Sequence, residues 1–469
     1  MKSRKLKNSL KGFFLILLLP LLFSSKAVSM TGFNLPRVEE RTAANGASLF
    51  FIKDELPRFS VTASFGYGQL YEDEKSAGTA NLLADYLSLA GSEKYPGQKL
   101  DEAIYSMGGS ISINSSWERT SVSIYVLHRF REQAADILKD LLARPRLDDA
   151  ESFETAKKML IDRIKRRYDD PADIAFSKTR SLIFNGKGYG SAASVKSVGA
   201  LALDDIKKAW NDYFTAGNLI AGIIYSGDFA ASEKLVLSTL ASVKEGKRAD
   251  YTPDYASAVR NVKESSGVIF LYPKEIPQAT IVAGTVAPDI HDERNPSFDL
   301  MDFILGRGSF TSRLMSEIRV KRGLAYSVGS VIRARAHTGV FLAYAQTSNS
   351  NAGITMELLI NNINDMAVSP PGVEELLWAK KSITNSYIFT FDTPQEVLSQ
   401  YVMRFAYSLP EDYYESYPDK VNAASAFDVK TSASGLLESG LVRVVVGSRD
   451  IIPELEKYGR VEILPSDEN

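Results

Sequence analysis

The sequence of 469 residues contains no cysteine and only three histidines, His128, His291 and His337. Without cysteine the chain can form neither a disulfide nor a thiolate metal site, and it has no cysteine nucleophile. The histidines show no ligand spacing, so a metal site built from several of them is not expected. A glycine-rich phosphate-binding loop is also missing.

An excess of charge of one sign is absent as well. The 55 basic and 57 acidic residues nearly cancel, which argues against a nucleic-acid-binding protein. With 45% apolar and 24% charged residues the composition is that of a globular protein, and the length exceeds that of one ordinary domain.

Residues 1–29 have the layout of a secretory signal peptide. Basic residues without an acidic one precede the apolar run Phe13–Phe23 of 11 residues, and small residues follow up to Ser29. A transmembrane helix needs nearer ~20 apolar residues. We therefore expect a secreted protein, most consistent with a bacterial periplasm, that is not membrane-embedded once the signal is cleaved.

Three blocks of the sequence occur twice in the same order. Residues 49–66 (LFFIKDELPRFSVTASFG) have the layout of residues 268–285 (VIFLYPKEIPQATIVAGT), with Glu55 matching Glu275. Two further blocks recur at a nearly constant offset, and the last places Gly227 opposite Gly447. This pattern indicates a tandem duplication of one structural unit.

Each unit combines strand and helix patterns. Ser60–Phe65 and Ser121–Leu127 are rich in β-branched and aromatic residues and predict strands. Ala77–Leu89 and Phe130–Leu142 have apolar residues at helical spacing. Long helices among few strands predict an α+β fold, with helices covering a mostly antiparallel sheet.

The domain boundaries follow from the repeat. We expect an N-terminal domain over 30–245 and a homologous C-terminal domain over 266–469. The segment 246–265 is polar and charged, shows no periodic apolar face and is interpreted as the linker.

The order of these blocks resembles the pitrilysin/insulinase family of zinc peptidases, including the mitochondrial-processing-peptidase type, from about Arg37 onward. The resemblance implies two tandem α+β domains of the LuxS/MPP-like metallopeptidase fold, in agreement with the repeat. The hallmark of the family is an inverted zinc motif, His-x-x-Glu-His, on the first long helix.

The matching positions of this chain have lost that motif. Asn81 and Asp85 replace the two histidines, Ala84 replaces the glutamate general base, and the family's third ligand falls at Asp162. An asparagine amide is a poor zinc ligand, and alanine cannot deprotonate a metal-bound water. We therefore expect that this chain binds no metal and has no peptidase activity alone. The oxygen atoms of Asn81, Asp85 and Asp162 leave a calcium or magnesium site open as an alternative.

The second half retains another signature of the family, in residues 304–332 (ILGRGSFTSRLMSEIRVKRGLAYSVGSVI). Active members use an arginine and a tyrosine seven positions apart to bind the substrate backbone and the oxyanion, and Arg319 and Tyr326 match this pair. An arginine fork suits carbonyl oxygens, and a phenol donor can stabilise an oxyanion. The competing interpretation is that Arg319 forms an ion pair with Glu317 or Glu375 and that Tyr326 is a core residue.

Two other segments have patterns that bear on peptide binding. Peptide substrates of the family add to a strand edge beside the metal helix, and the corresponding strand here follows Gly108-Gly109. The aromatic-rich stretch Tyr401–Pro418 is expected to pack between layers and not to form a site.

The resemblance implies a division of labour, because some bacterial members are heterodimers in which one chain carries the zinc motif and the other supplies the arginine–tyrosine pair. We therefore expect a non-catalytic subunit of a secreted heterodimeric zinc peptidase. Arg319 and Tyr326 would act in trans on a peptide substrate, and zinc would be bound by a related partner chain with an intact His-x-x-Glu-His motif. One alternative is a catalytically inactive peptide-binding or scaffold protein that has no zinc-bearing partner. Another is a metalloenzyme that uses Asp85 and Asp162.

Overall fold

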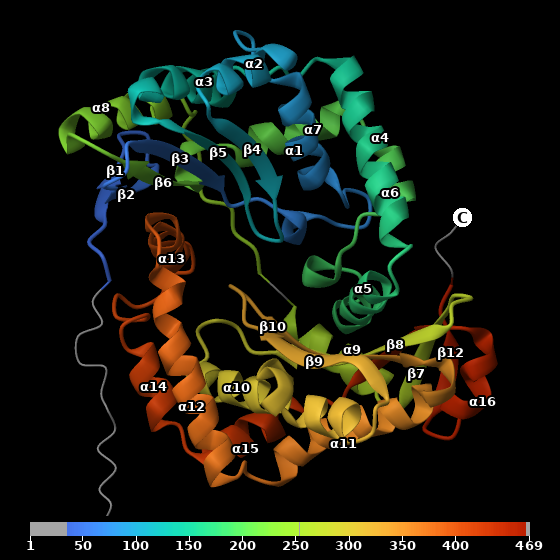
Figure 1. The fold of residues 1–469 in the computed structure, drawn as a ribbon. Helices are drawn as coiled ribbons and strands as arrows, with labels where there is room; N and C mark the ends of the chain where they lie inside the picture. The colour runs from blue at the N-terminus through green and yellow to red at the C-terminus, as the bar shows by residue number, and fades with distance from the viewer. Residues whose placement is uncertain (1–34, 253, 466–469) are drawn as a thin grey trace, which may run out of the picture.

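The computed structural model describes residues 35–252 and 254–465, so the predicted signal peptide lies outside the described residues. Two domains face each other, and each consists of a six-stranded sheet with helices packed on its outer side (Figure 1). No helix in the described ranges is long and apolar enough to cross a membrane.

The N-terminal domain contains the first six strands and eight helices of the described chain. Its strands are β1 (Glu39–Thr42), β2 (Ser48–Lys53), β3 (Arg58–Phe65), β4 (Ser110–Ser115), β5 (Thr120–Leu127) and β6 (Leu219–Tyr225). Its helices are α1 (Thr79–Ala90), α2 (Gln98–Ser106), α3 (Arg131–Ala143), α4 (Ala150–Arg167), α5 (Pro171–Phe184), α6 (Val195–Ala200), α7 (Leu203–Tyr213) and α8 (Phe229–Leu240).

The C-terminal domain repeats the plan. Its strands are β7 (Val268–Pro273), β8 (Gln278–Ala287), β9 (Ala325–Arg333), β10 (Gly339–Ser348), β11 (Val442–Gly447) and β12 (Arg460–Ile463). Its helices are α9 (Tyr255–Ser265), α10 (Asn295–Asp302), the π-helical η5 (Phe303–Arg307) and η7 (Met315–Val320), α11 (Ala352–Val368), α12 (Val373–Tyr387), α13 (Pro394–Ala406), α14 (Tyr417–Ala423), α15 (Ala426–Leu436) and α16 (Ile452–Leu455).

The two sheets have the same topology. Their orders are β1-β2-β6-β3-β5-β4 and β12-β7-β11-β8-β10-β9, so five consecutive strands are arranged identically in each. Neighbouring strands are antiparallel except for β2 with β6 in the first sheet and β7 with both β11 and β12 in the second. The predicted α+β class and the two tandem homologous domains are confirmed. The strands β4 and β9 occupy corresponding edges.

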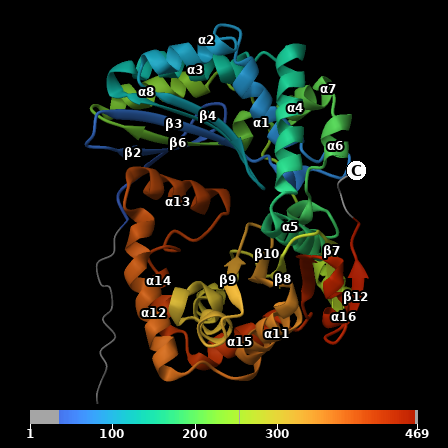
Figure 2. The same ribbon diagram turned by 45° about the vertical axis from the view of Figure 1, so that its right-hand side comes forward.

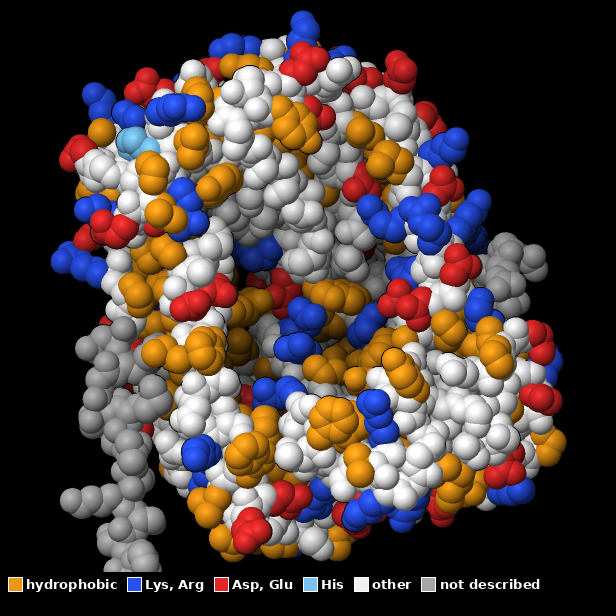
Figure 3. Space-filling model, viewed as in Figure 1, with side chains coloured by type: hydrophobic (Ala, Val, Ile, Leu, Met, Phe, Trp, Pro, Cys, Tyr) orange, Lys and Arg blue, Asp and Glu red, His pale blue; other side chains and the backbone are white. Residues whose placement is uncertain are grey.

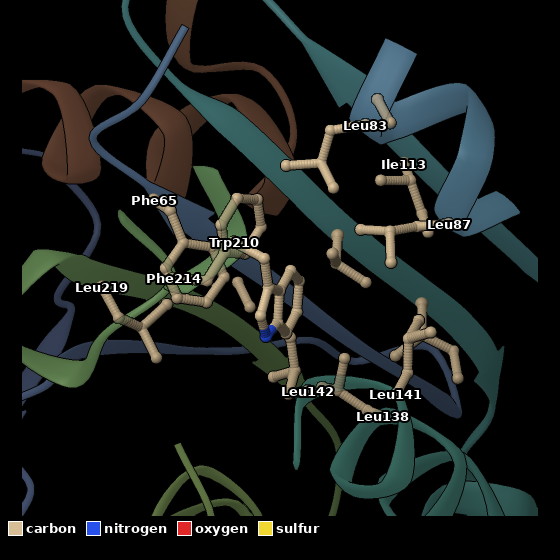
Figure 4. Close-up of a cluster of buried hydrophobic side chains, with 14 of the residues drawn as sticks. Phe65, Leu83, Leu87, Ile113, Leu138, Leu141, Leu142, Trp210, Phe214 and Leu219 are labelled. Carbon is tan, nitrogen blue, oxygen red and sulfur yellow. The ribbon is translucent and has the colours of Figure 1, made fainter. Parts of the chain in front are cut away.

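The outer face of the first sheet is covered by helices of its own domain. Side chains of α1, α3 and α7 meet those of the sheet, and the Trp210 ring stacks on the Phe214 ring with centroids 4.3 Å apart (Figure 4). Helix α1 was expected over Ala77–Leu89 and forms over Thr79–Ala90. Its apolar spacing therefore predicted its position to within two residues.

The inner faces of the two sheets are covered differently, because each receives a helix from the other domain. Helix α13 lies on β2 and β6, and helix α5 of the first domain lies on β8 and β11 (Figures 1 and 2). Successive side chains of a strand point to opposite faces, so Phe51 and Ile223 join the outer core while Phe50 and Ile224 contact α13.

Local signals explain where α13 begins. Thr393 Oγ1 accepts a hydrogen bond from the Glu396 N–H at 3.2 Å, and the Glu396 carboxylate accepts from the Thr393 N–H at 2.9 Å. This capping box precedes Pro394 at the first helical position, where proline costs no hydrogen bond. The expected packing of aromatic residues between layers is seen in Tyr414, which is buried in the cluster between α13 and the first sheet.

The predicted linker is partly helical, and the expectation that it lacks a periodic apolar face is wrong for its second half. Residues 255–265 form α9, which buries Ala258 and Val262 against α5 and β8. Val259 packs against the same cluster, and with Tyr255 the apolar residues recur at positions 255, 258, 259 and 262, which is helical spacing. The sequence therefore contained the signal for this helix.

Helix α13 should contribute measurably to stability. Leu398 is 2% exposed and lies against Gly222 of β6, where an added Cβ would come within 2.9 Å of Leu398 Cδ2. We expect Leu398→Ala to lower the free energy of unfolding by about 2–5 kcal/mol in urea denaturation, because it leaves a cavity between the domains. The control Leu377→Ala changes a 60% exposed leucine of α12 and should cost less than about 0.5 kcal/mol. Equal effects of the two variants would contradict the role of α13.

Candidate functional site

Helix α1 carries three of the four positions that match the family's zinc site. It begins after Gly78, which has a φ of 104°. The buried Glu72 carboxylate accepts the N–H groups of Gly78 at 2.8 Å and Ala80 at 2.6 Å. Since the first N–H groups of a helix have no partner within it, Glu72 fixes the start of α1.

The structure brings the matching positions to the interface of α1 and α4. Asn81 and Asp85 are one helical turn apart on α1, and Ala84 between them is buried with 3% exposure. Asp162 lies on α4 next to Arg163. Helices α1 and α4, which carry these positions, pack against each other.

The residues present do not fit zinc. Asp85 Oδ2 accepts a hydrogen bond from Arg163 Nη2 at 2.6 Å, and Asn81 Oδ1 accepts one from Gln69 at 3.5 Å. The guanidinium of Arg163 thus supplies a positive charge at the place where a metal ion would have to bind. No three histidine, aspartate or glutamate side chains converge on a metal position among residues 35–252 and 254–465.

Burial raises the pKa of Glu72 to about 7, and the two backbone N–H groups that it accepts oppose this shift only in part. The sequence analysis did not single out this residue. Its position six residues before Gly78 was the available signal, because an acidic side chain close to a helix N-terminus is a capping pattern.

Arg319 and Tyr326 lie together at the edge of the second sheet. Arg319 is on η7 and Tyr326 is on the edge strand β9, with the guanidinium carbon 5.6 Å from the centre of the Tyr326 ring. The same guanidinium lies 5.7 Å from the Phe310 ring, and Nη1 contacts Met315 Sδ at 4.0 Å. Aromatic faces attract cations, so these contacts orient the arginine without neutralising it.

The competing interpretation of this pair is wrong. Glu317 instead binds Arg322 at 2.6 Å and also Lys321, whereas Glu375 binds Arg313 at 2.7 Å. Tyr326 is 77% exposed and is not a core residue. Within the described ranges no carboxylate pairs with Arg319, so its donors are available to a ligand.

The predicted edge strand is also present. β4 follows Gly108-Gly109, forms the edge of the first sheet and contacts α1. β4 and β9 thus place the vacated metal site and the Arg319–Tyr326 pair at equivalent edges of the two sheets.

A cavity of about 510 Å³ lies between the domains. Figure 3 shows it as a hollow with Lys and Arg side chains on its walls. The sequence analysis missed this feature, because its lining comes from both domains and from the segment between them. Glu118-Arg119, charged residues within a serine-rich hairpin, were the only local signal.

Two models of one protein family match the chain. Residues 54–193 match "Insulinase (Peptidase family M16)", and residues 200–383 match "Peptidase M16 inactive domain". Together they cover most of the described chain.

Individual relatives span nearly the whole protein. An "Uncharacterized zinc protease" of Rickettsia felis is 23% identical over 82% of this chain and 91% of its own length. The "Non-peptidase homolog YmxG" of Helicobacter pylori is 24% identical, over 90% of this chain and 94% of its own length.

Solved structures share the fold. The crystal structure of a peptidase M16 inactive domain from Pseudomonas fluorescens superposes with a TM-score of 0.78 at 21% identity, covering 88% of this chain and 98% of that chain. A protease from Helicobacter pylori gives a TM-score of 0.77 at 15% identity, over 88% of this chain and 100% of that chain.

The fold and the altered helix α1 define a metallopeptidase homologue without the zinc motif. The chain belongs to the insulinase family, peptidase family M16.

Restoring the motif should create zinc binding. We expect the wild-type chain, after dialysis against zinc, calcium or magnesium, to retain no stoichiometric metal by mass spectrometry. The combined variant Asn81→His, Ala84→Glu, Asp85→His and Asp162→Glu should retain zinc, because imidazole and carboxylate groups are strong zinc ligands.

The control for this experiment is Asp101→His with Tyr105→His, which places two histidines at the same spacing on the exposed side of α2. It should retain much less zinc, since it lacks a third ligand. Stoichiometric metal in the wild-type chain would contradict the interpretation of a vacated site.

The raised pKa of Glu72 predicts a pH dependence of stability. Between its ordinary value of 4.5 and about 7, the folded protein keeps a proton on Glu72 that the unfolded chain releases. The contribution of this group is therefore fully present below about pH 4.5 and is lost as the pH rises to about 7, a change of roughly 3 kcal/mol.

This dependence should disappear in Glu72→Gln and persist in Glu74→Gln, which alters an exposed neighbour. Urea denaturation at several pH values measures it. The same pH profile for wild type and Glu72→Gln would disprove the assignment.

Proposed function

We propose that the chain is the non-catalytic subunit of a secreted heterodimeric zinc peptidase and supplies Arg319 and Tyr326 to the active site of its partner. The observation that carries this proposal is the pair of half-buried Arg319 and exposed Tyr326, whose arginine has no carboxylate partner in the described chain. The loss of the metal ligands on α1 makes a partner necessary for chemistry.

The chemistry of the pair suits a peptide bond under attack. The Arg319 guanidinium, oriented by Phe310 and Tyr326, can donate two parallel hydrogen bonds to backbone carbonyl oxygens. The Tyr326 hydroxyl can donate to the negative oxygen that develops in the tetrahedral intermediate. The ring contacts of Arg319 restrict its side chain, which would reduce the ordering required on substrate binding.

The partner in this proposal is a related chain with an intact His-x-x-Glu-His motif, which binds the zinc and carries the general base. The substrate is a peptide held between the two chains. The basic and apolar segment at the start of the sequence supports export, and a bacterial periplasm is the proposed compartment.

The competing candidate is a peptide-binding or scaffold protein that acts without a zinc-bearing partner. The Helicobacter pylori relative, a non-peptidase homologue, agrees with either candidate. The two differ in one respect, since only the first requires a zinc-bearing chain for its function.

The role of the pair is tested by reconstitution. The chain is co-purified with a His-x-x-Glu-His relative from the same genome, and cleavage of a fluorogenic peptide is measured. Tyr326→Phe should lower kcat about 10²-fold, because it removes a donor to the developing oxyanion. Arg319→Gln should lower kcat/KM, because it removes donors to the substrate backbone, and assembly by gel filtration should stay unchanged in both variants.

Tyr105→Phe is the matched control, because Tyr105 is 78% exposed on α2 and Tyr326 is 77% exposed. It should leave kcat unaltered. The assigned role would be disproved if Arg319→Gln and Tyr326→Phe left cleavage unchanged. It would also be disproved if these variants prevented assembly of the two chains.

A further inference from the structure

The cavity between the domains is lined by charged side chains of both signs. Its lining includes the cationic side chains of Arg119 and Arg248 and the imidazoles of His291 and His337. The acidic side chains of the lining are Glu118 and Asp250. Glu118 is buried, whereas Arg248 and Asp250 are both exposed.

The two arginines are held by neutral oxygens. Arg119 donates to Ser64 Oγ at 2.8 Å and to the Ser64 carbonyl oxygen at 2.5 Å, and Arg248 donates to the Ala406 carbonyl oxygen. Neither arginine forms an ion pair with a carboxylate of the described chain. Burial and then the nearby charge of Arg248 lower the pKa of Arg119 to about 10, so it stays protonated at neutral pH.

Glu118 does not act as their ion-pair partner. One of its carboxylate oxygens accepts the Tyr189 hydroxyl at 2.5 Å and the Ala336 N–H at 3.3 Å, and the other accepts the Tyr407 hydroxyl. These bonds tie a hairpin of the first domain to two segments of the second. Both oxygens of Glu118 therefore accept hydrogen bonds from groups at the contact between the domains. Neither oxygen accepts one from Arg119 or Arg248.

Two further arginines lie beside Trp117, the residue before Glu118 in the sequence. Arg180 and Arg335 both lie over the Trp117 ring, with guanidinium carbons 5.6 and 5.9 Å from its centre. Arg180 Nε is buried without a hydrogen-bond partner in the described chain. A buried donor without a partner is costly, but Arg180 is not part of the cavity lining.

Hydroxyl side chains line a second cavity next to the first one. A second cavity of about 250 Å³ shares Arg119 and Tyr407 with the first and includes Thr62, Ser64 and Ser121. The Ser121 hydroxyl donates to Ser64 Oγ at 2.9 Å. Hydroxyl donors beside guanidinium groups that form no ion pair make a suitable environment for an anion, because charged and neutral donors can both bind its oxygen atoms.

We propose that this chamber binds the carboxylate groups of acidic peptides. The proposal rests on the proposed function, which makes the ligand a peptide, and adds to it the charge of the preferred substrate. Arg119 and Arg248 bind the carboxylate, while Tyr71, Tyr251 and Tyr407 contact the rest of the peptide. A peptide carboxylate can come from an aspartate or glutamate side chain or from the C-terminus.

Direct binding to the complete mature chain tests the proposal without the partner and without cleavage. Fluorescence anisotropy compares labelled peptides of equal length with amidated C-termini, one containing glutamate, one glutamine at the same positions and one lysine. A fourth peptide has the neutral sequence and a free C-terminus. We expect the glutamate peptide to bind at least about tenfold more tightly than the glutamine peptide, and the difference to shrink at high salt.

Arg248→Gln should weaken binding of the glutamate peptide about tenfold, because it removes a charged donor. Arg119→Gln is a second variant, with the fold checked by thermal melting. The control Arg260→Gln changes an exposed arginine of α9 that does not line the cavity and should have no effect.

The outcomes are distinct. Preference for the glutamate peptide supports a side-chain carboxylate, and preference for the free C-terminus alone supports a terminal carboxylate. Equal affinities for all four peptides, or full affinity in Arg248→Gln, would overturn the proposal. Because no turnover is measured, a failure here is separate from a failure of Arg319 and Tyr326 in the cleavage assay.

Discussion

The reciprocal burial of the inner sheet faces is the interaction on which the rest of this structure depends. Each sheet has apolar side chains on both faces, and the helices of its own domain cover mainly the outer one, with α9 on the inner face of the second sheet as the exception. The helix that covers the inner face comes from the other domain, α13 for the first sheet and α5 for the second. The hydrophobic effect therefore holds the domains face to face, and the chamber with its charged walls exists only because of this contact.

Loss of the zinc motif has changed the chemistry of α1 while its framework has been kept. The helix still begins at the buried Glu72 cap and still packs against α4. In the place of a metal ion stands the ion pair of Asp85 with Arg163, which gives the carboxylate a positive neighbour. The pair compensates the charge of both side chains, whereas the apolar side chains of α1 and α4 keep the two helices together, because an exposed ion pair contributes little to stability.

Arginines in this protein fall into two groups with different physical roles. Arg313 and Arg163 pair with carboxylates and connect elements of the fold. Arg319, Arg119 and Arg248 are oriented by aromatic rings, hydroxyl groups or carbonyl oxygens and keep their charge uncompensated. The second group lies at the sheet edge and in the chamber, which are the places where a peptide would have to bind. The absence of a carboxylate partner is thus the common feature of the candidate ligand-binding side chains.

The sequence by itself determined the duplication, the α+β class, the approximate positions of helices such as α1 and the loss of the zinc ligands, because these depend on periodicity and residue type along the chain. It also singled out Arg319 and Tyr326 through their local signature. Only the tertiary structure decided that their ion-pair alternatives are taken by other residues and that Arg163 neutralises Asp85, 78 positions earlier. Two further features could not be predicted from the sequence. One is the packing of α5 and α13 on the sheet of the other domain, and the other is the hydrogen bond of Tyr407 to Glu118, 289 positions away. Contacts over such separations depend on how two domains pack, and no pattern within one segment records that packing.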